Sequence, residues 1–460
     1  EADVLEYWIS SFNIPEIAQQ GGVLPPLTSG QQPVSTLMVS SDLCSSSASQ
    51  LAYCNVGQRA FVVDENNQSI RIIDYGDLTD PALIPDGLGG FLSISADNIS
   101  TELANAGVSD YGALVPSDID IFNVVGPDDT TYCCSTMVAV AWIDTLSLIN
   151  PGWVTFHGID GDLLDATEAI RQVGPTPRSL AFSQDGGWLV VACSGEGEHV
   201  VGDPEAEIVC IDVTGYTHAT GAPNWAGVVD YPFSFAAGPH VAGGSLVITG
   251  DAHRTSVYDG LNTDLSYVLE PSHVAITPDN ERAFVNCQVN NTVVEVNLEN
   301  VISGDDVISG AYGFGTRNMG TGNGFDGKDN GEALLELPSI TILGWYQPGD
   351  MEIVVNGSKT ILLTANEGLP SLNGLGEEDV TLSNIPEYIN LELDSEYGYG
   401  ANGIGDSYIF GSRSFAIWDI TLPSTSPSLI YDSGSLIEET LAELMPEYAN
   451  SVKSTYDSGD

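Results

Sequence analysis

Pro177-Arg-Ser-Leu-Ala-Phe-Ser-Gln-Asp185 and Pro271-Ser-His-Val-Ala-Ile-Thr-Pro-Asp279 are two copies of one pattern, and the same spacing leads on to Cys193 and Cys287. Each copy starts an apolar run, a turn rich in Asp, Asn and Gly, and a second apolar run, which predicts two antiparallel strands joined by a tight turn. A third strand is predicted after each copy, at residues 207–213 and 292–297. Antiparallel strands that recur in this way are typical of the blades of a β-propeller.

The pattern recurs in weaker form along the chain. The predicted strand pairs are residues 59–64 with 69–74, 137–143 with 153–158, 350–355 with 360–365, and 414–420 with 428–431. Together with the two copies, they predict an all-β protein with about five propeller blades and long inserted loops. A helix is predicted at residues 437–448, which are rich in Glu, Leu and Ala.

These predictions divide the chain into three parts. Residues 1–54 are an N-terminal extension or the first strands, residues 55–435 are the blades with Gly- and Asp-rich loops, and residues 436–460 are a helical C-terminal segment. Long loops on such a scaffold often bind ions or partners.

The charge of the chain is its strongest compositional signal. The 64 Asp and Glu residues exceed the 11 Lys and Arg residues, which gives a formal net charge of -53, while 42% of the residues are hydrophobic and can form a core. Nucleic acids and anionic membranes are poor partners for such a surface, because both require basic residues. Cations reduce the repulsion between carboxylates, so we expect a saline or calcium-rich setting; the alternative is that the acidity serves only solubility.

Several features suggest a protein that works outside the cell. No apolar run reaches the length of a membrane-spanning helix, and Glu1 in place of an initiator Met suggests that a leader was removed. Four glycosylation sequons begin at Asn67, Asn98, Asn290 and Asn356, and they matter if the chain follows a eukaryotic secretory route. We therefore expect a secreted, extracellular protein.

The seven cysteines leave at least one without a partner in the chain. Cys44 and Cys54 flank a short segment that a disulfide could close, and Cys193 and Cys210 lie on successive predicted strands. The alternative for Cys193, Cys210 and Cys287 is a buried thiol that acts as a small apolar side chain. No spacing matches a zinc finger or a haem attachment site.

An ordered set of motifs resembles the choice-of-anchor I family. The motifs are residues 271–298, 324–331 (Gly-Phe-Asp-Gly-Lys-Asp-Asn-Gly), 345–348 (Trp-Tyr-Gln-Pro), 363–368 (Leu-Thr-Ala-Asn-Glu-Gly), 411–419 (Gly-Ser-Arg-Ser-Phe-Ala-Ile-Trp-Asp) and 431–434 (Tyr-Asp-Ser-Gly). The family is related to the mesenchyme-specific cell surface glycoproteins of biomineralising animals, and some members are labelled alkaline phosphatase-like. The resemblance implies a seven-bladed propeller on a secreted or surface-attached protein.

The family pattern continues for about two blades beyond the last of these motifs. This chain ends at Asp460, so we expect either a C-terminal fragment or a neighbouring chain to complete the propeller, or a different closure of the ring.

Acidic and amide residues recur after the second strand of several predicted blades. Because equivalent hairpins open on the same end of a propeller, their oxygens are expected to form a ring that binds calcium. The predicted ligands are Asp64, Glu65, Glu196, Glu198, Asn366 and Glu367, with Gln288 and Asn290 at the same place in another blade. The alternative is that these are ordinary hairpin residues.

A second calcium candidate is the Gly-spaced loop with Asp326, Asp329 and Asn330. It departs from an EF-hand, because Lys328 and Leu337 stand at ligand positions, and its alternative is a solvated turn.

Support for catalysis is weak. The six histidines lack metal-binding spacing, and no Gly-x-Ser-x-Gly elbow occurs. Asp251, His253 and Arg254 could bind an anion beside a metal and, with Glu196 or Glu367, are the candidates for phosphoric ester hydrolysis; the alternative for His253 is a structural role.

Three functions are therefore open. The first is a calcium-binding surface or extracellular-matrix propeller with a structural or interaction role. The second is a calcium-dependent phosphoesterase. The third is an adhesive or filament-forming subunit that assembles with itself.

Overall fold

In the part of the chain that the computed structural model describes, β-strands are the main secondary structure. The structure describes residues 48–54, 57–64, 67–76, 81–86, 90–105, 107–108, 111–123, 136–166, 168–195, 204–216, 225–253, 264–321, 324–325, 341–369, 394 and 407–444. Contacts divide the chain into two units, Glu1–Val140 with Thr155–Ala169, and Ala141–Val154 with Ile170–Asp460. Each unit is described by itself. No helix in the described part of the chain is long and apolar enough to cross a membrane.

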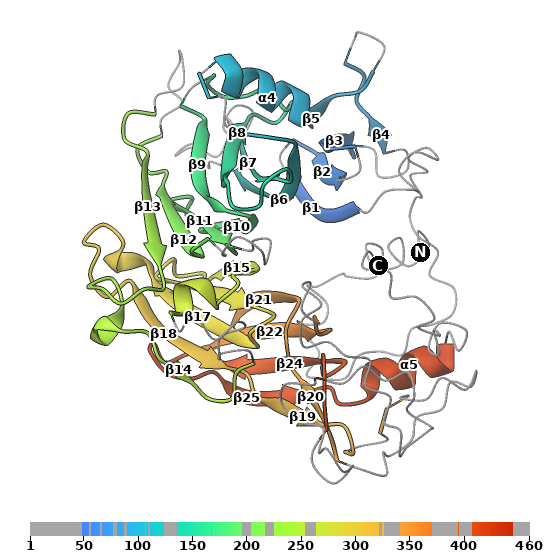
Figure 1. Cartoon of the computed structure of the whole chain (residues 1–460). Coiled ribbons are helices and arrows are strands. Elements are labelled where there is room, and N and C mark those ends of the chain that lie inside the picture. Colours follow the sequence, from blue (N-terminus) through green and yellow to red (C-terminus); the bar gives the residue numbers. More distant parts are fainter. Residues whose placement is uncertain are drawn as a thin grey trace. The chain divides into compact units, whose positions relative to one another are not determined.

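The first unit contains the sheet β1-β2-β3-β4, with β5 paired to β3 (Figure 1). Its elements are β1 (Ala48–Cys54), β2 (Arg59–Asp64), β3 (Ser69–Asp74), β4 (Ala82–Leu83), β5 (Ser93–Ser95), α4 (Ala96–Asn105) and β6 (Leu114–Asn123). β2 and β3 form the predicted hairpin, in which Phe61 and Ile72 are paired and fully buried. α4 buries Ile99 and Leu103, one helical turn apart, and contacts β5 and β6.

β6 is the first strand of the sheet β6-β7-β8-β9. The other strands are β7 (Thr136–Asp144), β8 (Pro151–His157) and β9 (Ile170–Pro175). β7 and β8 are buried along nearly their whole length, as expected of strands covered on both faces.

The two sequence copies form two consecutive sheets of the second unit. The first sheet is β10-β11-β12-β13, with β10 (Pro177–Phe182), β11 (Trp188–Cys193), β12 (Glu207–Asp212) and β13 (Val229–Ser234). The second is β14-β18-β17-β16-β15, with β14 (Ile248–Thr249), β15 (His273–Ile276), β16 (Arg282–Cys287), β17 (Thr292–Asn297) and β18 (Ile308–Gly313). The single-turn 3-10 helices are η1 (Ala242–Gly244), η2 (Leu265–Tyr267) and η3 (Leu298–Asn300).

The two copies share the same spacing because both use the same turn. Ser183 Oγ lies 2.7 Å from Asp185 Oδ1, and Thr277 Oγ1 lies 2.5 Å from Asp279 Oδ1. The same hydroxyls also contact the carbonyl oxygens of Trp188 and Arg282, which begin the next strand. Hydroxyl and carboxylate therefore close the same turn in both copies.

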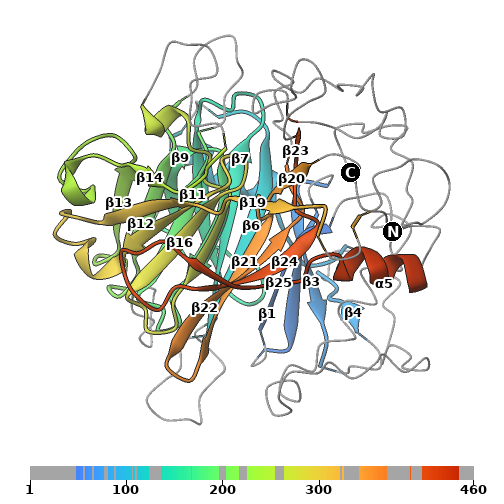
Figure 2. The same ribbon diagram turned by 90° about the horizontal axis from the view of Figure 1, so that it is seen from below.

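The remaining strands form two more sheets. The sheet β19-β20-β23 contains β19 (Thr316–Asn318), β20 (Ile342–Trp345) and β23 (Ser407–Ile409). The sheet β21-β22-β24-β25 contains β21 (Asp350–Asn356), β22 (Lys359–Asn366), β24 (Ser414–Asp419) and β25 (Ser428–Asp432), and Figure 2 shows these strands side by side. It is followed by α5 (Leu436–Leu444).

Two apolar clusters hold the sheets of the second unit together. One, with Val190, Ile208, Val285 and Val294 at its centre, joins the two sheets formed by the sequence copies. The other joins the second of these sheets to β21-β22-β24-β25 through Phe284, Leu362, Ala416 and Trp418, among others. Successive antiparallel sheets that pack face to face are propeller blades.

The predicted β-propeller class is confirmed, and each predicted strand pair is present. The described residues form six sheets, against about five predicted blades. The predicted C-terminal helix is confirmed over Leu436–Leu444, and the rest of its predicted range lies outside the described residues. Cys193, Cys210 and Cys287 are buried thiols. Cys193 and Cys210 do not form a disulfide with each other, because the strand register places Cys193 opposite Glu207 and Cys210 opposite Val190.

Candidate functional site

Four of the sequence motifs, 271–298, 345–348, 363–368 and 411–419, meet at Gln347, whose side chain is fully buried. Gly411 N donates to Gln347 Oε1 at 3.3 Å, and Gly368 N donates to Gln347 O at 3.3 Å. Gln347 N in turn donates to Asn291 Oδ1 at 2.8 Å, which brings the second sequence copy to the same point. These hydrogen bonds connect the motifs 345–348, 363–368 and 411–419, so their residues have a structural role at this point.

The predicted ligands of the second unit lie beside this junction. Gln288 Nε2 donates to Glu367 Oε1 at 3.3 Å, so the structure brings these two residues together. Asn366 is buried, and its Nδ2 donates to Ser414 Oγ at 3.3 Å. Asn290 is also buried, but its Oδ1 accepts from Glu270 N at 2.8 Å and its Nδ2 donates to Val268 O at 2.8 Å. The hairpin interpretation therefore holds for Asn290.

Asp64 belongs to the first unit and is engaged within its own hairpin. Its carboxylate is buried and accepts from Asn67 N at 3.1 Å and from Asn67 Nδ2 at 2.7 Å, with Arg71 Nε at 3.5 Å. Six further predicted ligands lie outside the described residues: Glu65, Glu196, Glu198, Asp326, Asp329 and Asn330. Within the described residues, no group of three or more His, Cys, Asp or Glu side chains is arranged to hold a metal ion.

The candidate catalytic histidine lies in a buried hydrogen-bonded pair. His253 Nε2 is 2.8 Å from Asp394 Oδ2, and the exposed fractions of the two side chains are 0% and 1%. His253 Nδ1 lies 2.8 Å from Val289 O, and Trp345 Nε1 donates to Asp394 Oδ2 at 2.9 Å. A side chain enclosed in this way does not meet a substrate in solution, so the geometry favours the structural role of His253.

The two other candidates for catalysis do not complete a site with His253. Asp251 is exposed, and its backbone carbonyl accepts from Gly315 N at 3.0 Å. Arg254 lies outside the described residues. The sequence interpretation missed Asp394, because 141 residues separate it from His253 and no local pattern connects them.

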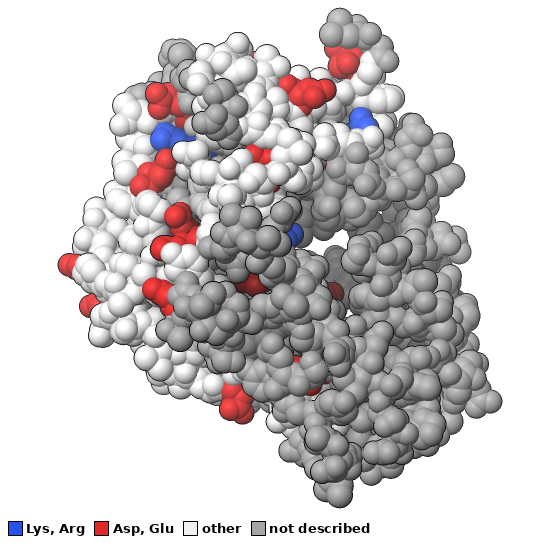
Figure 3. Space-filling model, viewed as in Figure 1, with Lys and Arg blue, Asp and Glu red and all other residues white. Residues whose placement is uncertain are grey.

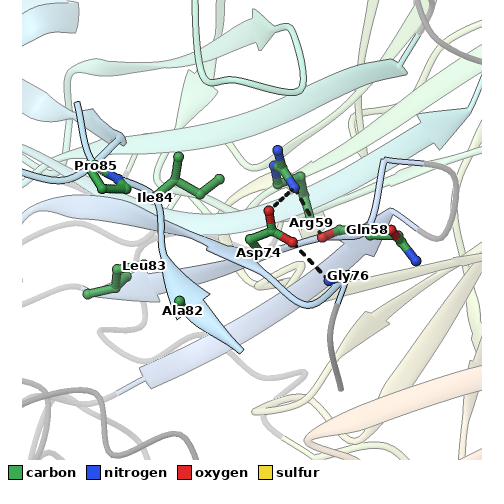
Figure 4. Close-up of a pocket in the computed structure, with 8 residues that line it drawn as sticks. All are labelled: Gln58, Arg59, Asp74, Gly76, Ala82, Leu83, Ile84 and Pro85. Carbon is green, nitrogen blue, oxygen red and sulfur yellow. Dashed lines mark hydrogen bonds and ion pairs between the residues drawn. The ribbon is translucent and has the colours of Figure 1, made fainter. Parts of the chain in front are cut away.

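One hollow of about 530 Å³ lies in the first unit (Figure 4). Its lining residues are Gln58, Arg59, Asp74, Gly76, Ala82, Leu83, Ile84 and Pro85. Arg59 NH1 lies 2.9 Å from Asp74 Oδ2, and Gly76 N donates to Asp74 Oδ1 at 2.8 Å, as the dashed lines show. Its charged groups therefore neutralise each other.

A second hollow of about 460 Å³ lies along β9, β12 and β13 and is acidic. Its lining residues are Pro151, Gln172, Val173, Gly174, Pro175, Glu205, Glu207, Val209, Asp230 and Pro232. Arg171 NH1 lies 3.5 Å from Asp230 Oδ2, and Tyr267 OH donates to Glu205 Oε1 at 2.9 Å. Burial and then the charge of Glu205 raise the pKa of Glu207. The hollow therefore favours a cationic group.

We expect Glu207→Gln to raise the melting temperature at pH 7 by about 1 to 2 °C. The folded chain holds the proton of Glu207 more tightly than the unfolded chain, whose pKa is near 4.5, so stability falls as pH rises through the raised folded pKa. The gain should shrink as the pH is lowered to 4.5. Melting curves at both pH values test this, with the exposed Glu299→Gln as control; a lower melting temperature of Glu207→Gln at pH 7 would contradict it.

Among known protein families, the model described as the choice-of-anchor I domain matches residues 49–385 and 380–459 of the chain. A search of the curated proteins finds no match.

Solved structures similar to the chain include hydrazine synthase of Kuenenia stuttgartiensis, with 13% identity, a TM-score of 0.26, and coverage of 55% of this chain and 65% of that chain. A Dos1 propeller has 9% identity, a TM-score of 0.37, and coverage of 84% of this chain and 69% of that chain. The β-propeller domain of Cps50 (Swd1) from Myceliophteria thermophila has 8% identity, a TM-score of 0.31, and coverage of 69% of this chain and 80% of that chain. The chain spans less than two thirds of the hydrazine synthase chain. At such low TM-scores, the fold assignment depends on the sheets of the chain itself.

Proposed function

The chain belongs to the choice-of-anchor I family, and on this basis we propose that it is a secreted, surface-attached propeller that binds calcium and has a structural or interaction role outside the cell. The family resemblance of the sequence motifs is confirmed by the match over most of the chain. The blades supply a rigid scaffold, and the loops between their strands are free to carry binding residues.

The observation that supports calcium binding is the excess of carboxylates over basic groups, 64 against 11. On the face shown in Figure 3, acidic side chains are scattered over the surface and basic ones are few. Burial raises the pKa of Glu207, and it is also the main cause of the raised pKa of Asp230 and Glu352. Such carboxylates lie in surroundings that a bound cation would make more favourable.

We expect removal of calcium to lower the melting temperature by about 3 to 5 °C, because an ion that binds only the folded chain stabilises it by mass action. The measurement is a melting curve of the full chain in excess calcium and in EDTA. Sodium chloride at matched ionic strength is the control, since it screens charges without coordinating them. Equal melting temperatures in calcium and in EDTA would argue against the proposal.

A calcium-dependent phosphoesterase receives no support from the described residues. His253 is enclosed with Asp394, and the polar groups of the hollow in Figure 4 are paired with each other. We therefore propose a role in binding in preference to hydrolysis, and release of phosphate from generic esters in the presence of calcium would argue for the second function.

A further inference from the structure

Two buried asparagine side chains have amide oxygens without a donor. Asn286 and Asn366 are exposed by 0% and 2%, and among the described residues neither Oδ1 has a hydrogen-bond partner. Both Nδ2 groups are engaged: that of Asn286 donates to Pro348 O and that of Asn366 to Ser414 Oγ. Buried acceptors left without a partner are rare in folded proteins, and each calls for an unseen donor or ion.

The two side chains lie in the layer between the same two blades. Asn286 follows Phe284 by two residues on β16, and Asn366 follows Leu362 by four residues on β22. Alternate residues of a strand share a face, and Phe284 and Leu362 belong to one apolar cluster between these sheets. Asn286 and Asn366 therefore extend that layer beyond its apolar part.

One short segment connects the two asparagines. Asn286 binds Pro348 O, and the next residue, Gly349, donates from its N to Ala365 O at 2.9 Å. Ala365 immediately precedes Asn366 in β22. The segment 348–349 therefore contacts both the side chain of Asn286 and the strand that carries Asn366.

A carboxylate lies at the same segment. A Cβ on Gly349 would lie 1.8 Å from Glu367 Oε1, so a larger residue at position 349 would displace the Glu367 carboxylate from its present position. Gln288 Nε2 holds the same oxygen at 3.3 Å. Glu367 itself is exposed and forms the outer rim of this group.

We propose that Asn286, Asn366 and Glu367 bind one calcium ion between the two blades, an inference that rests on the proposed calcium binding. Calcium takes six to eight oxygens and accepts amide oxygens, carboxylates and water. The two amide oxygens supply the inner ligands, and the exposed carboxylate supplies the charge and the entrance. A buried water is the alternative donor for these oxygens, and the calcium-binding measurements below distinguish it from an ion.

The ion adds to the contacts between these two sheets, which also include His273 Nε2 with Asp350 Oδ1 at 2.8 Å and Arg282 NH1 with Ile420 O at 2.9 Å, so it stabilises one blade against the next. The sequence predicted Asn366 and Glu367 as ligands but missed Asn286. Asn286 lies inside β16, whereas the expected ligands follow the ends of strands.

The test uses terbium, which replaces calcium and is excited through tryptophan, on the full chain. Trp418 Nε1 donates to Thr364 Oγ1 at 3.0 Å, two residues before Asn366, so a tryptophan lies close enough to excite a bound ion. We expect Glu367→Gln to lower the affinity for terbium, and for calcium that competes with it, by about tenfold or more. The exposed Glu299→Gln should leave both affinities unchanged.

A second variant, Asn366→Asp, replaces an amide oxygen by a charged one. We expect it to bind calcium more tightly than the natural chain and to melt at a lower temperature in EDTA, because an unpaired buried carboxylate is unfavourable.

The outcomes separate the site from the function. Unchanged calcium affinity in both variants, with calcium still stabilising the natural chain, would overturn the inter-blade site and leave the proposed function standing. If calcium leaves the melting temperature of the natural chain unchanged, both the inter-blade site and the proposed calcium binding are overturned.

Discussion

Replacing His253 by glutamine is expected to lower the free energy of unfolding by about 3 to 5 kcal/mol, as measured by urea denaturation. The side chains of His253 and Asp394 are fully buried, and their atoms Nε2 and Oδ2 lie 2.8 Å apart. Glutamine does not reproduce the positions of both ring nitrogens between Val289 O and Asp394 Oδ2, so the buried carboxylate loses a contact at 2.8 Å. Removing a hydrogen-bond partner of a buried carboxylate destabilises the fold strongly.

His157 provides a matched control. It is buried as well, but it contacts neutral groups, Thr155 Oγ1 at 2.8 Å and Gly161 O at 3.0 Å. Burial lowers the pKa of His157 to about 4, so it is neutral at pH 7. We expect His157→Gln to lower the free energy of unfolding by about 1 to 2 kcal/mol. Equal losses in the two variants would show that the carboxylate of Asp394 adds nothing to the stabilisation by a buried histidine.

The pair also admits a double-mutant test. Asp394→Asn removes the carboxylate that lacks its imidazole contact in His253→Gln. The double variant should therefore lose less free energy of unfolding than the sum of the two single losses. Additive losses in the double variant would show that His253 and Asp394 do not stabilise the fold as a pair. The stability measurement therefore tests the structural role of His253.

The sequence predicts best what is local. The hairpins of the two copies depend on a hydroxyl and a carboxylate two residues apart, as in Ser183 and Asp185, and such turns can be read from neighbouring letters. α4 was missed, because its buried face consists mainly of Ile99 and Leu103 and gives a weak helical period.

Contacts between distant residues could not be predicted. The junction at Gln347 joins motifs that are dozens of residues apart, so the motifs looked like separate signatures although one side chain connects them. Asn286 carries no signal, since an asparagine inside a strand looks like any polar residue. Completion of the propeller by a partner, self-assembly and the ligands outside the described residues stay predictions.

The second large effect is expected at Gly368, which lies against Gly411. Gly368 has φ +85° and Gly411 has φ +75°, a region that other residues enter only with strain. A Cβ on Gly368 would lie 2.2 Å from Gly411 N, and one on Gly411 would lie 2.1 Å from Glu367 O. We expect Gly368→Ala to lower the free energy of unfolding by about 2 to 5 kcal/mol, from backbone strain and the clash together.

Gly357 separates these two causes. It has φ +65° in the turn between β21 and β22, but no atom lies within 4 Å of the place a Cβ would take. Gly357→Ala should therefore lower stability only by the strain, about 1 to 2 kcal/mol. A loss at Gly368 no larger than that at Gly357 would mean that the two loops are not in contact. A larger loss, accompanied by weaker calcium binding, would tie the position of Glu367 to the same junction, because Gly368 is the next residue in the chain.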